Sequence, residues 1–203
     1  MSATTAPYLV QLANLKAQLE ADPNEFLRTT QDLRDADLLL IGKLIQLYCF
    51  ADLNARRIID SLRSAADDPS AGNASKLVDA DVFPHLHKAA DLLWNSNMKD
   101  GLHKAAYSIE INRSHRHLFA HWSARRVRNH NVLILFSKNA TEARRRDGIS
   151  QEPDELKFGM VPLDAFATEL PILEAHTMYL AECASDLERD ADAYRKRFSE
   201  ISK

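Results

Sequence analysis

Residues 35–66, from Asp35 to Ala66, read DADLLLIGKLIQLYCFADLNARRIIDSLRSAA and form the longest regularly patterned stretch of the chain. Apolar residues recur there mostly three or four positions apart, which is the spacing of one side of an α-helix: Leu40, Leu44, Leu47, Phe50, Ile58 and Leu62. A helix of this length needs packing partners along all of it. The stretch therefore predicts a helical bundle.

Similar patterns on either side predict further helices over about residues 8–21, 24–34, 81–97, 99–121 and 163–199, with a loop at 67–76. Asp22 can cap the helix at 24–34, with Pro23 at its first position. Pro84 would lie in the first turn of the helix at 81–97, and Pro171 should kink or split the last helix. Residues 1–7 are expected to be a disordered leader.

A change of pattern after Trp122 predicts β-structure. Residues 123–128 and 131–137 fit a hairpin, because β-branched and alternating residues flank a polar turn. After a charged loop at 144–153, residues 156–161 fit a third short strand. The expected fold is mainly α: one domain over residues 1–203, with about five helices and a small β-hairpin or three-strand excursion at 123–161.

The composition fits a globular protein, with 45% hydrophobic and 27% charged residues, and the 5 glycines are few enough to favour helices. Cys49 and Cys183 both lie in apolar helical patterns, so we expect reduced cysteines in the core of a cytoplasmic protein. No signal peptide is recognisable. Apolar runs such as Leu38–Ile41 are far too short to span a membrane, so no membrane partner is expected.

Positive charge is concentrated in one part of the chain. Residues 101–146 hold ten Lys or Arg and two acids, a net charge of +8, which leaves −11 for the remainder because the whole chain carries −3. A basic patch on an acidic body is typical of a surface that binds a polyanion. The alternative is solvated surface charge paired with acidic helices.

Within this window, residues 109–122 read IEINRSHRHLFAHW. On a helix, Arg113, His117 and His121 would share one side, with Arg116 at its flank. The opposite side would be an apolar stripe that faces the core: Tyr107, Ile111, Leu118 and Trp122. The stretch therefore predicts one helix that gathers cationic and titratable groups on a single face.

The segment from Arg116 to His121 is an R-x4-H element, and it resembles the signature of the HEPN superfamily of helical-bundle domains. His117 fills the polar position after the arginine, and Ala120 precedes the final histidine, as is common in that family. The resemblance implies a HEPN-like bundle that cleaves RNA without a metal ion or cofactor, across a homodimer interface. It further implies a role in stress response or phage defence, with an antitoxin as a protein partner.

The resemblance gives the catalytic roles to Arg116, His121 and His117. An imidazole can take the 2′-hydroxyl proton or protonate the leaving oxygen, and a guanidinium can hold the phosphate. Three alternatives compete with this interpretation. The first is a non-catalytic HEPN-like module that binds RNA, a nucleotide or a protein, and the second is a structural protein. The third is a metal site at His117 and His121, which are four residues apart. Arg125 and His130 also satisfy R-x4-H and form a decoy pair.

Other residues are expected to support this site. Phosphate contacts are assigned to four arginines of the basic window: Arg113, Arg125, Arg126 and Arg128. Asp52 is expected to orient a histidine or an arginine, although a surface ion pair is the alternative for both Asp52 and Arg113. His85 and His87 are two residues apart and do not share a helix face, so they make a poor pair of metal ligands.

Overall fold

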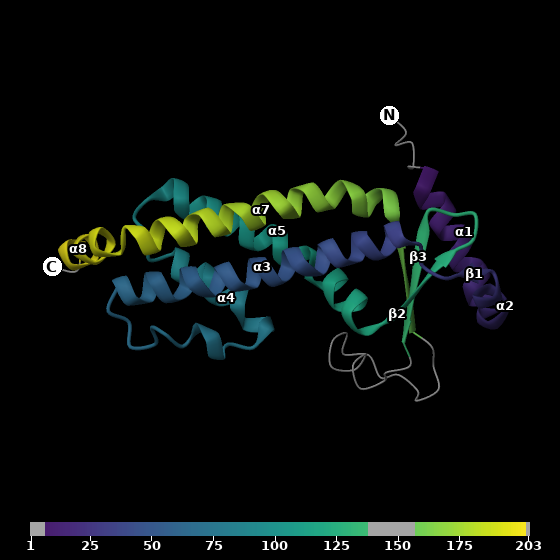
Figure 1. Ribbon diagram of the computed structural model, residues 1–203, viewed down its shortest axis with the longest axis horizontal. Coiled ribbons are helices and arrows are strands. Elements are labelled where there is room, and N and C mark those ends of the chain that lie inside the picture. The colour runs from purple at the N-terminus through teal and green to yellow at the C-terminus, as the bar shows by residue number, and fades with distance from the viewer. Residues whose placement is uncertain (1–6, 138–156, 202–203) are drawn as a thin grey trace. The chain divides into compact units, whose positions relative to one another are not determined.

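The computed structural model describes residues 7–137 and 157–201 (Figure 1). Its contacts divide the chain into two compact units, and the boundaries fall inside three long helices. The sheet unit comprises Met1–Gly42 and His117–Glu169, and the helical unit comprises Lys43–Arg116 and Leu170–Lys203. The predicted leader, residues 1–7, lies outside the described residues except for Pro7, which already begins the first helix.

The sheet unit holds two short helices and a four-stranded antiparallel sheet in the order β1-β2-β3-β4. Its complete elements are α1 (Pro7–Ala21), α2 (Pro23–Arg28), β1 (Thr30–Gln31), β2 (Ser123–Val127), β3 (Val132–Ser137) and β4 (Lys157–Pro162). The predicted hairpin and third strand are confirmed, and the turn between β2 and β3 contains Asn129 in the left-handed region, with φ of 63°.

The strand β1 is a correction to the helix predicted over residues 24–34 and adds a fourth strand to the three expected. Asp22 does cap α2, since its side chain accepts from the backbone amides of Asn24 and Glu25, as the sequence predicts. The helix stops after Arg28 because the hydroxyl of Thr29 donates to a carbonyl of the last turn, 2.7 Å away. Thr30 then pairs with Val127 of β2.

The core of the sheet unit lies between the two short helices and one face of the sheet. Leu15 and Leu19 of α1 and Phe26 of α2 are buried in one cluster with Val127, Val132 and Ile134. Alternate residues of a strand point to opposite faces, yet Leu133 and Leu135 between these positions are fully buried as well. The strand β3 is therefore buried on both sides.

A buried ion pair lies in the same unit. Arg126 of β2 donates from Nη1 to Oδ1 of Asp37 at 2.6 Å and from Nη2 to the side-chain oxygen of Asn131 at 2.9 Å. The two charged side chains are only 10% and 5% exposed. Removal of one partner from such a pair is strongly destabilising, because the remaining charge stays buried without compensation.

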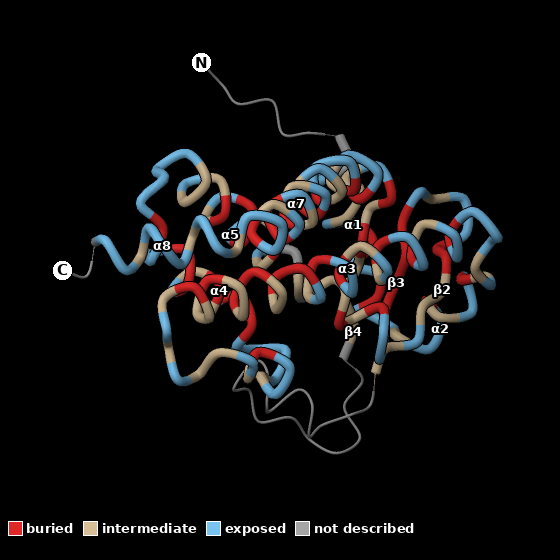
Figure 2. The backbone as a smooth tube through the Cα atoms, turned by 60° about the vertical axis from the view of Figure 1, so that its left-hand side comes forward, coloured by how far each residue is buried: buried red, intermediate tan, exposed pale blue. Residues whose placement is uncertain are grey.

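The helical unit contains most of α3 (Asp35–Ala65), α5 (Ser96–His121) and α7 (Leu163–Arg189), together with the whole of α4 (Asp79–Ala90) and α8 (Ala191–Ile201). A short 3-10 helix, η1 (Ala74–Lys76), precedes α4. The long helix predicted at 35–66 and the bundle it implies are confirmed. Buried positions recur along α3, α4, α5 and α7 (Figure 2), and the largest include Ile58, Leu86, Leu102 and Leu180.

Two of the predicted helices have different boundaries in the structure. The helix expected over residues 81–97 begins at Asp79 and ends at Ala90, so Pro84 lies inside it rather than in its first turn. Asn95 accounts for the break, because its side chain accepts hydrogen bonds from the amides of Asn97 and Met98 and so starts α5. The last helix runs through Pro171 and breaks only at Asp190, between α7 and α8.

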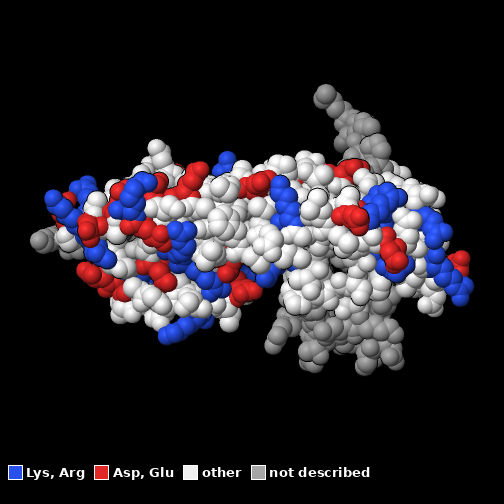
Figure 3. All heavy atoms as spheres, viewed as in Figure 1, with Lys and Arg blue, Asp and Glu red and all other residues white. Residues whose placement is uncertain are grey.

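The exposure of the two cysteines and of the C-terminal charges can be compared with the sequence predictions. Cys183 is buried as predicted, but Cys49 is exposed. On the face drawn in Figure 3, acidic and basic side chains alternate over the end of α7 and over α8, where Arg189 pairs with Asp186 and Arg195 with Asp192. Within residues 7–137 and 157–201, no helix combines the length and apolar character that crossing a membrane requires.

Candidate functional site

The orientation of α5 differs from the one predicted. Tyr107 and Ile111, expected in the core, are 64% and 57% exposed. The buried face of the helix is instead formed by Leu102, Ala105, Ala106 and Ile109. Arg113 and Arg116 lie four and seven residues after Ile109, so they continue the buried face rather than an opposite polar one. The error arose because the packed residues include two alanines, which add little to an apolar pattern.

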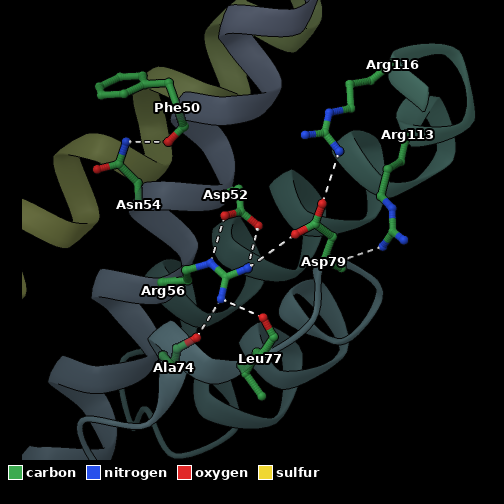
Figure 4. A network of polar contacts seen from close by, with 9 residues as sticks. All are labelled: Phe50, Asp52, Asn54, Arg56, Ala74, Leu77, Asp79, Arg113 and Arg116. Atoms are coloured by element: carbon green, nitrogen blue, oxygen red, sulfur yellow. Dashed lines mark hydrogen bonds and ion pairs between the residues drawn. The ribbon is translucent and has the colours of Figure 1, made fainter. Parts of the chain in front are cut away.

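Three arginines of the helical unit converge on Asp79, the first residue of α4 (Figure 4). Arg116 donates from Nη1 to Oδ2 of Asp79 at 3.2 Å, and Arg113 donates to the Asp79 backbone oxygen at 2.9 Å. Arg56 of α3 approaches the other carboxylate oxygen, with 3.6 Å between Nη2 and Oδ1. We call Arg56, Arg113, Arg116 and Asp79 the arginine cluster.

The cluster is positioned by a second carboxylate and by the loop before α4. Asp52, one turn before Arg56 on α3, accepts from its Nε at 2.7 Å. Arg56 Nη1 also donates to the carbonyl oxygens of Ala74 and Leu77, at 2.7 and 2.9 Å. Asp52 therefore orients an arginine, but the arginine is Arg56 and not Arg116. These contacts bind the segment that leads into α4 and so hold Asp79 near α5.

A cavity of about 130 Å³ opens at the cluster. Its lining combines two aromatic residues, one cysteine and charged groups of both signs: Tyr48, Cys49, Asp52, Asp79, Phe83, Arg113 and Arg116. The three guanidinium groups of the cluster outnumber the two carboxylates, Asp52 and Asp79, by one positive charge. The Nε of Arg116 is buried and has no hydrogen-bond partner among the described residues. A buried donor in this state favours an incoming acceptor, such as an oxygen of an anion.

The two histidines of the motif lie in the sheet unit, because the unit boundary falls between Arg116 and His117. His117, expected on the polar side of the helix, is only 9% exposed, whereas His121 is exposed. Their ring centroids are 4.3 Å apart, with 37° between the ring planes. The structure thus brings Arg113, Arg116 and Asp52 to one cavity and pairs the two imidazoles with each other.

The arginines of β2 and the following turn have different surroundings. Arg125 pairs with Asp32 at 3.0 Å and donates to the hydroxyl of Thr30 at 2.9 Å. Arg126 is buried against Asp37, so its guanidinium lies in the interior of the sheet unit and not on its surface. Arg128 is exposed. The other basic residues of the window after β3 (Lys138, Arg144, Arg145 and Arg146) lie outside the described residues.

Sequence reasoning missed Arg56 and Asp79 as parts of the site. The spacing of Asp52 and Arg56 by four residues on one helix is a usable signal for an ion pair, and Asp79 lies where acidic residues favour a helix N-terminus. Neither signal indicates that the two meet Arg113 and Arg116. Among residues 7–137 and 157–201, no group of three or more His, Cys, Asp or Glu side chains is placed to hold a metal ion.

Comparisons with protein-family models, with curated proteins and with solved structures find no match to this chain. The arginine cluster, its cavity and the R-x4-H motif are therefore the features from which a function can be inferred.

Proposed function

We propose that this protein is a metal-independent endoribonuclease of the HEPN type. The observation that supports the proposal most directly is the convergence of three arginines on Asp79 at a cavity: Arg116 and Arg56 approach its largely exposed carboxylate, and Arg113 donates to its backbone oxygen. Arginine forks bind carboxylates and phosphates with the same geometry, so Asp79 occupies the kind of position that a phosphodiester of RNA would take. The side chain of Asp79 is 63% exposed and can move aside for a ligand.

In this proposal Arg116 and Arg113 hold a backbone phosphate and stabilise the negative charge that grows on it during the reaction. Arg116 has one unused buried donor, its Nε, in addition to the Nη1 that now contacts Asp79. A phosphate that displaces Asp79 would accept from Nη1, and Nε, on another edge of the guanidinium, is left to donate to a further acceptor oxygen. The excess of one positive charge over the carboxylates favours a bound anion.

His121 supplies proton transfer in the same scheme, with His117 beside it. The imidazole of His121 takes the proton of the 2′-hydroxyl as the 2′-oxygen attacks phosphorus, and the bond from phosphorus to the 5′-oxygen breaks. The leaving 5′-oxygen takes a proton from an imidazolium or from water. The products are a 2′,3′-cyclic phosphate, or its hydrolysis product, and a 5′-hydroxyl. No metal ion or cofactor is needed for this step.

A two-fold homodimer, and a role in stress response or phage defence with an antitoxin as partner, belong to the same proposal. The exposure of Tyr107 and Ile111 on α5 supports the dimer, because large apolar side chains on one exposed helix face favour association. Light scattering at high micromolar concentration should give the mass of a dimer, and Tyr107→Glu should shift it toward the monomer. A monomeric wild-type mass would contradict the dimer.

The second candidate is a non-catalytic HEPN-like module that binds RNA, a nucleotide or a protein partner. This candidate is favoured because the arginine cluster contains no histidine, and Arg113 and Arg116 are sufficient to bind a phosphate. The two candidates differ in one measurable respect, which is the cleavage of a phosphodiester bond.

The test is cleavage of a pool of cellular RNAs by the purified protein in the presence of EDTA. The wild type should cleave and leave 2′,3′-cyclic phosphate ends. His121→Ala should lower the rate on the order of 100-fold as loss of a general acid or base. Arg116→Ala should lower it to a similar degree, on the order of 100-fold, as loss of charge stabilisation in the transition state.

The decoy pair provides matched controls on the same basic stretch. Arg125→Ala and His130→Ala also disrupt an R-x4-H element, but they should weaken RNA binding at most and leave the turnover of bound RNA largely intact. If the wild type cleaves no RNA yet binds it, the non-catalytic module replaces the ribonuclease. If His121→Ala cleaves as fast as the wild type, the assigned chemistry is wrong.

A further inference from the structure

A second cluster of titratable groups lies in the helical unit, outside the arginine cluster. His87 of α4 and His103 of α5 face each other with their Nδ1 atoms 2.7 Å apart. The ring planes are nearly parallel, with 13° between them and centroids 5.0 Å apart. Sixteen residues separate the two histidines, so their spacing gives no signal in the sequence. The sequence instead draws attention to His85 and His87, which do not form such a pair.

Asp91, the residue just after α4, determines which ring nitrogen of His103 carries the proton. The Nε2 of His103 lies 3.2 Å from Oδ1 of Asp91, and Lys99 Nζ contacts the same oxygen at 2.8 Å. A carboxylate can only accept a hydrogen bond from an imidazole, so the proton of a neutral His103 lies on Nε2. The Nδ1 of His103 is then an unprotonated nitrogen directed at His87. A histidine that binds a metal ion through one ring nitrogen usually donates a hydrogen bond from the other, often to a carboxylate as here.

We propose that His87 and His103 bind a Zn²⁺ ion through their two Nδ1 atoms, with Asp91 as the carboxylate that orients His103. Zinc–nitrogen bonds of about 2.0–2.1 Å at a tetrahedral angle require about 3.4 Å between the two nitrogens. The present separation is 2.7 Å, so an opening of about 0.7 Å is needed, which small side-chain rotations supply. Zn²⁺ replaces the single proton that the two Nδ1 atoms share.

The surroundings suit a cation at this place. A metal ion binds the neutral form of imidazole, and burial, followed by the nearby His103, lowers the pKa of His87. Glu110 and Asp91 act on His87 in the opposite sense, as negative charges that attract a cation. Lys99 is the opposing positive charge, and it is held on Asp91. The side chain of His103 is 31% exposed, which leaves the site open to solvent.

Water is the natural ligand for the remaining positions of the ion, because the described residues contain no third protein donor placed at the site. The ion would join α4 to α5. These two helices also carry Asp79, Arg113 and Arg116, so zinc would restrain the same helix pair that forms the arginine cluster. The site does not depend on the proposed ribonuclease, whose chemistry uses no metal ion.

The test uses full-length protein without a histidine tag, treated with chelator, in which only the histidines carry ¹⁵N. Long-range ¹H–¹⁵N spectra distinguish Nδ1 from Nε2 in each imidazole. Before metal is added, His103 should show the tautomer with its proton on Nε2. Titration with ZnCl₂ should then shift the Nδ1 signals of His87 and His103 together along one saturable curve, and EDTA should reverse the shift.

Variants at the site and one control on the same helix sharpen this test. His87→Gln and His103→Gln should each abolish the saturable shift of the remaining histidine, and Asp91→Asn should weaken zinc binding about tenfold. His85→Gln should leave it unchanged. The proposal is overturned if zinc shifts other histidines first while His87 and His103 stay unchanged. The wild-type titration decides this even where a variant fails to fold.

Discussion

Asp79→Asn is expected to tighten the binding of RNA. The carboxylate of Asp79 lies where the proposal places a phosphate, and it contacts Arg116 at 3.2 Å and Arg56 at 3.6 Å. RNA must therefore compete with Asp79 for the same guanidinium groups. Asparagine keeps the shape of the side chain but removes its negative charge, so the competition weakens.

The magnitude follows from the exposure of the contact. The side chain of Asp79 is 63% exposed and that of Arg116 is 29% exposed, so solvent screens the ion pair. Pairs of this kind contribute about 0.2–1 kcal/mol. Relief from the competition should therefore strengthen RNA binding by up to about fivefold, because 1.4 kcal/mol corresponds to a factor of ten.

The assay is fluorescence anisotropy of a short labelled RNA at low and high salt. Asp81→Asn is the matched control, because Asp81 is also an exposed acid in the first turn of α4. Either substitution removes one negative charge from the helix N-terminus and should lower the stability by about 0.3–1 kcal/mol. Only Asp79→Asn also frees Arg116, so only this variant should gain affinity beyond a general charge effect.

Two results would refute this reasoning. Equal affinities of the Asp79→Asn and Asp81→Asn variants would mean that Asp79 does not compete with RNA. Weaker binding by Asp79→Asn than by the wild type would mean that Asp79 positions the arginines for RNA rather than blocking them. In addition, affinity should fall as salt rises, because phosphate contacts release counterions, and a flat salt response would remove the electrostatic basis of the proposal.

Three further predictions concern stability, each measured by urea denaturation. Gly101→Ala would direct a Cβ into the ring of Tyr179 and should destabilise by about 1–3 kcal/mol, although alanine favours helices by about 1 kcal/mol; a net gain would show that the ring yields. Asp37→Ala strands buried Arg126 and should remove about 3–5 kcal/mol, while Asp37→Ala with Arg126→Met should lose less; an equal loss would argue against the stranded charge. Hydrogen bonds from Arg57 of α3 lower the pKa of Glu188 from 4.5. The ion pair therefore stabilises the fold above pH 4.5, and this contribution is lost as the pH falls through the lowered pKa. Glu188→Gln should thus destabilise at about pH 7, and this loss should shrink as the pH falls below 4.5; a pH-independent effect would count against the pair.

Most helices and the hairpin could be predicted because their signals are local. The apolar spacing along residues 35–66 identifies α3 almost to the residue, and Asp22 followed by proline marks the start of α2. The turn at Asn129 lies where polar residues separate two β-rich runs. The break between α4 and α5 was predicted too late in the sequence, between residues 97 and 99, although the side-chain cap that Asn95 provides at the start of α5 is also a local signal.

By itself, the sequence determined that a long amphipathic α3 must be covered by other helices, and that basic and titratable groups are concentrated on α5. Only the tertiary structure decided which side of α5 is buried, since alanines at 105 and 106 pack while Tyr107 and Ile111 remain exposed. It also decided which side chains meet: Asp79 with Arg116 and His87 with His103 come from different helices. Sequence periodicity gives the direction of a side chain around its own helix axis, whereas a site between helices depends on how the helices pack, which no local pattern encodes.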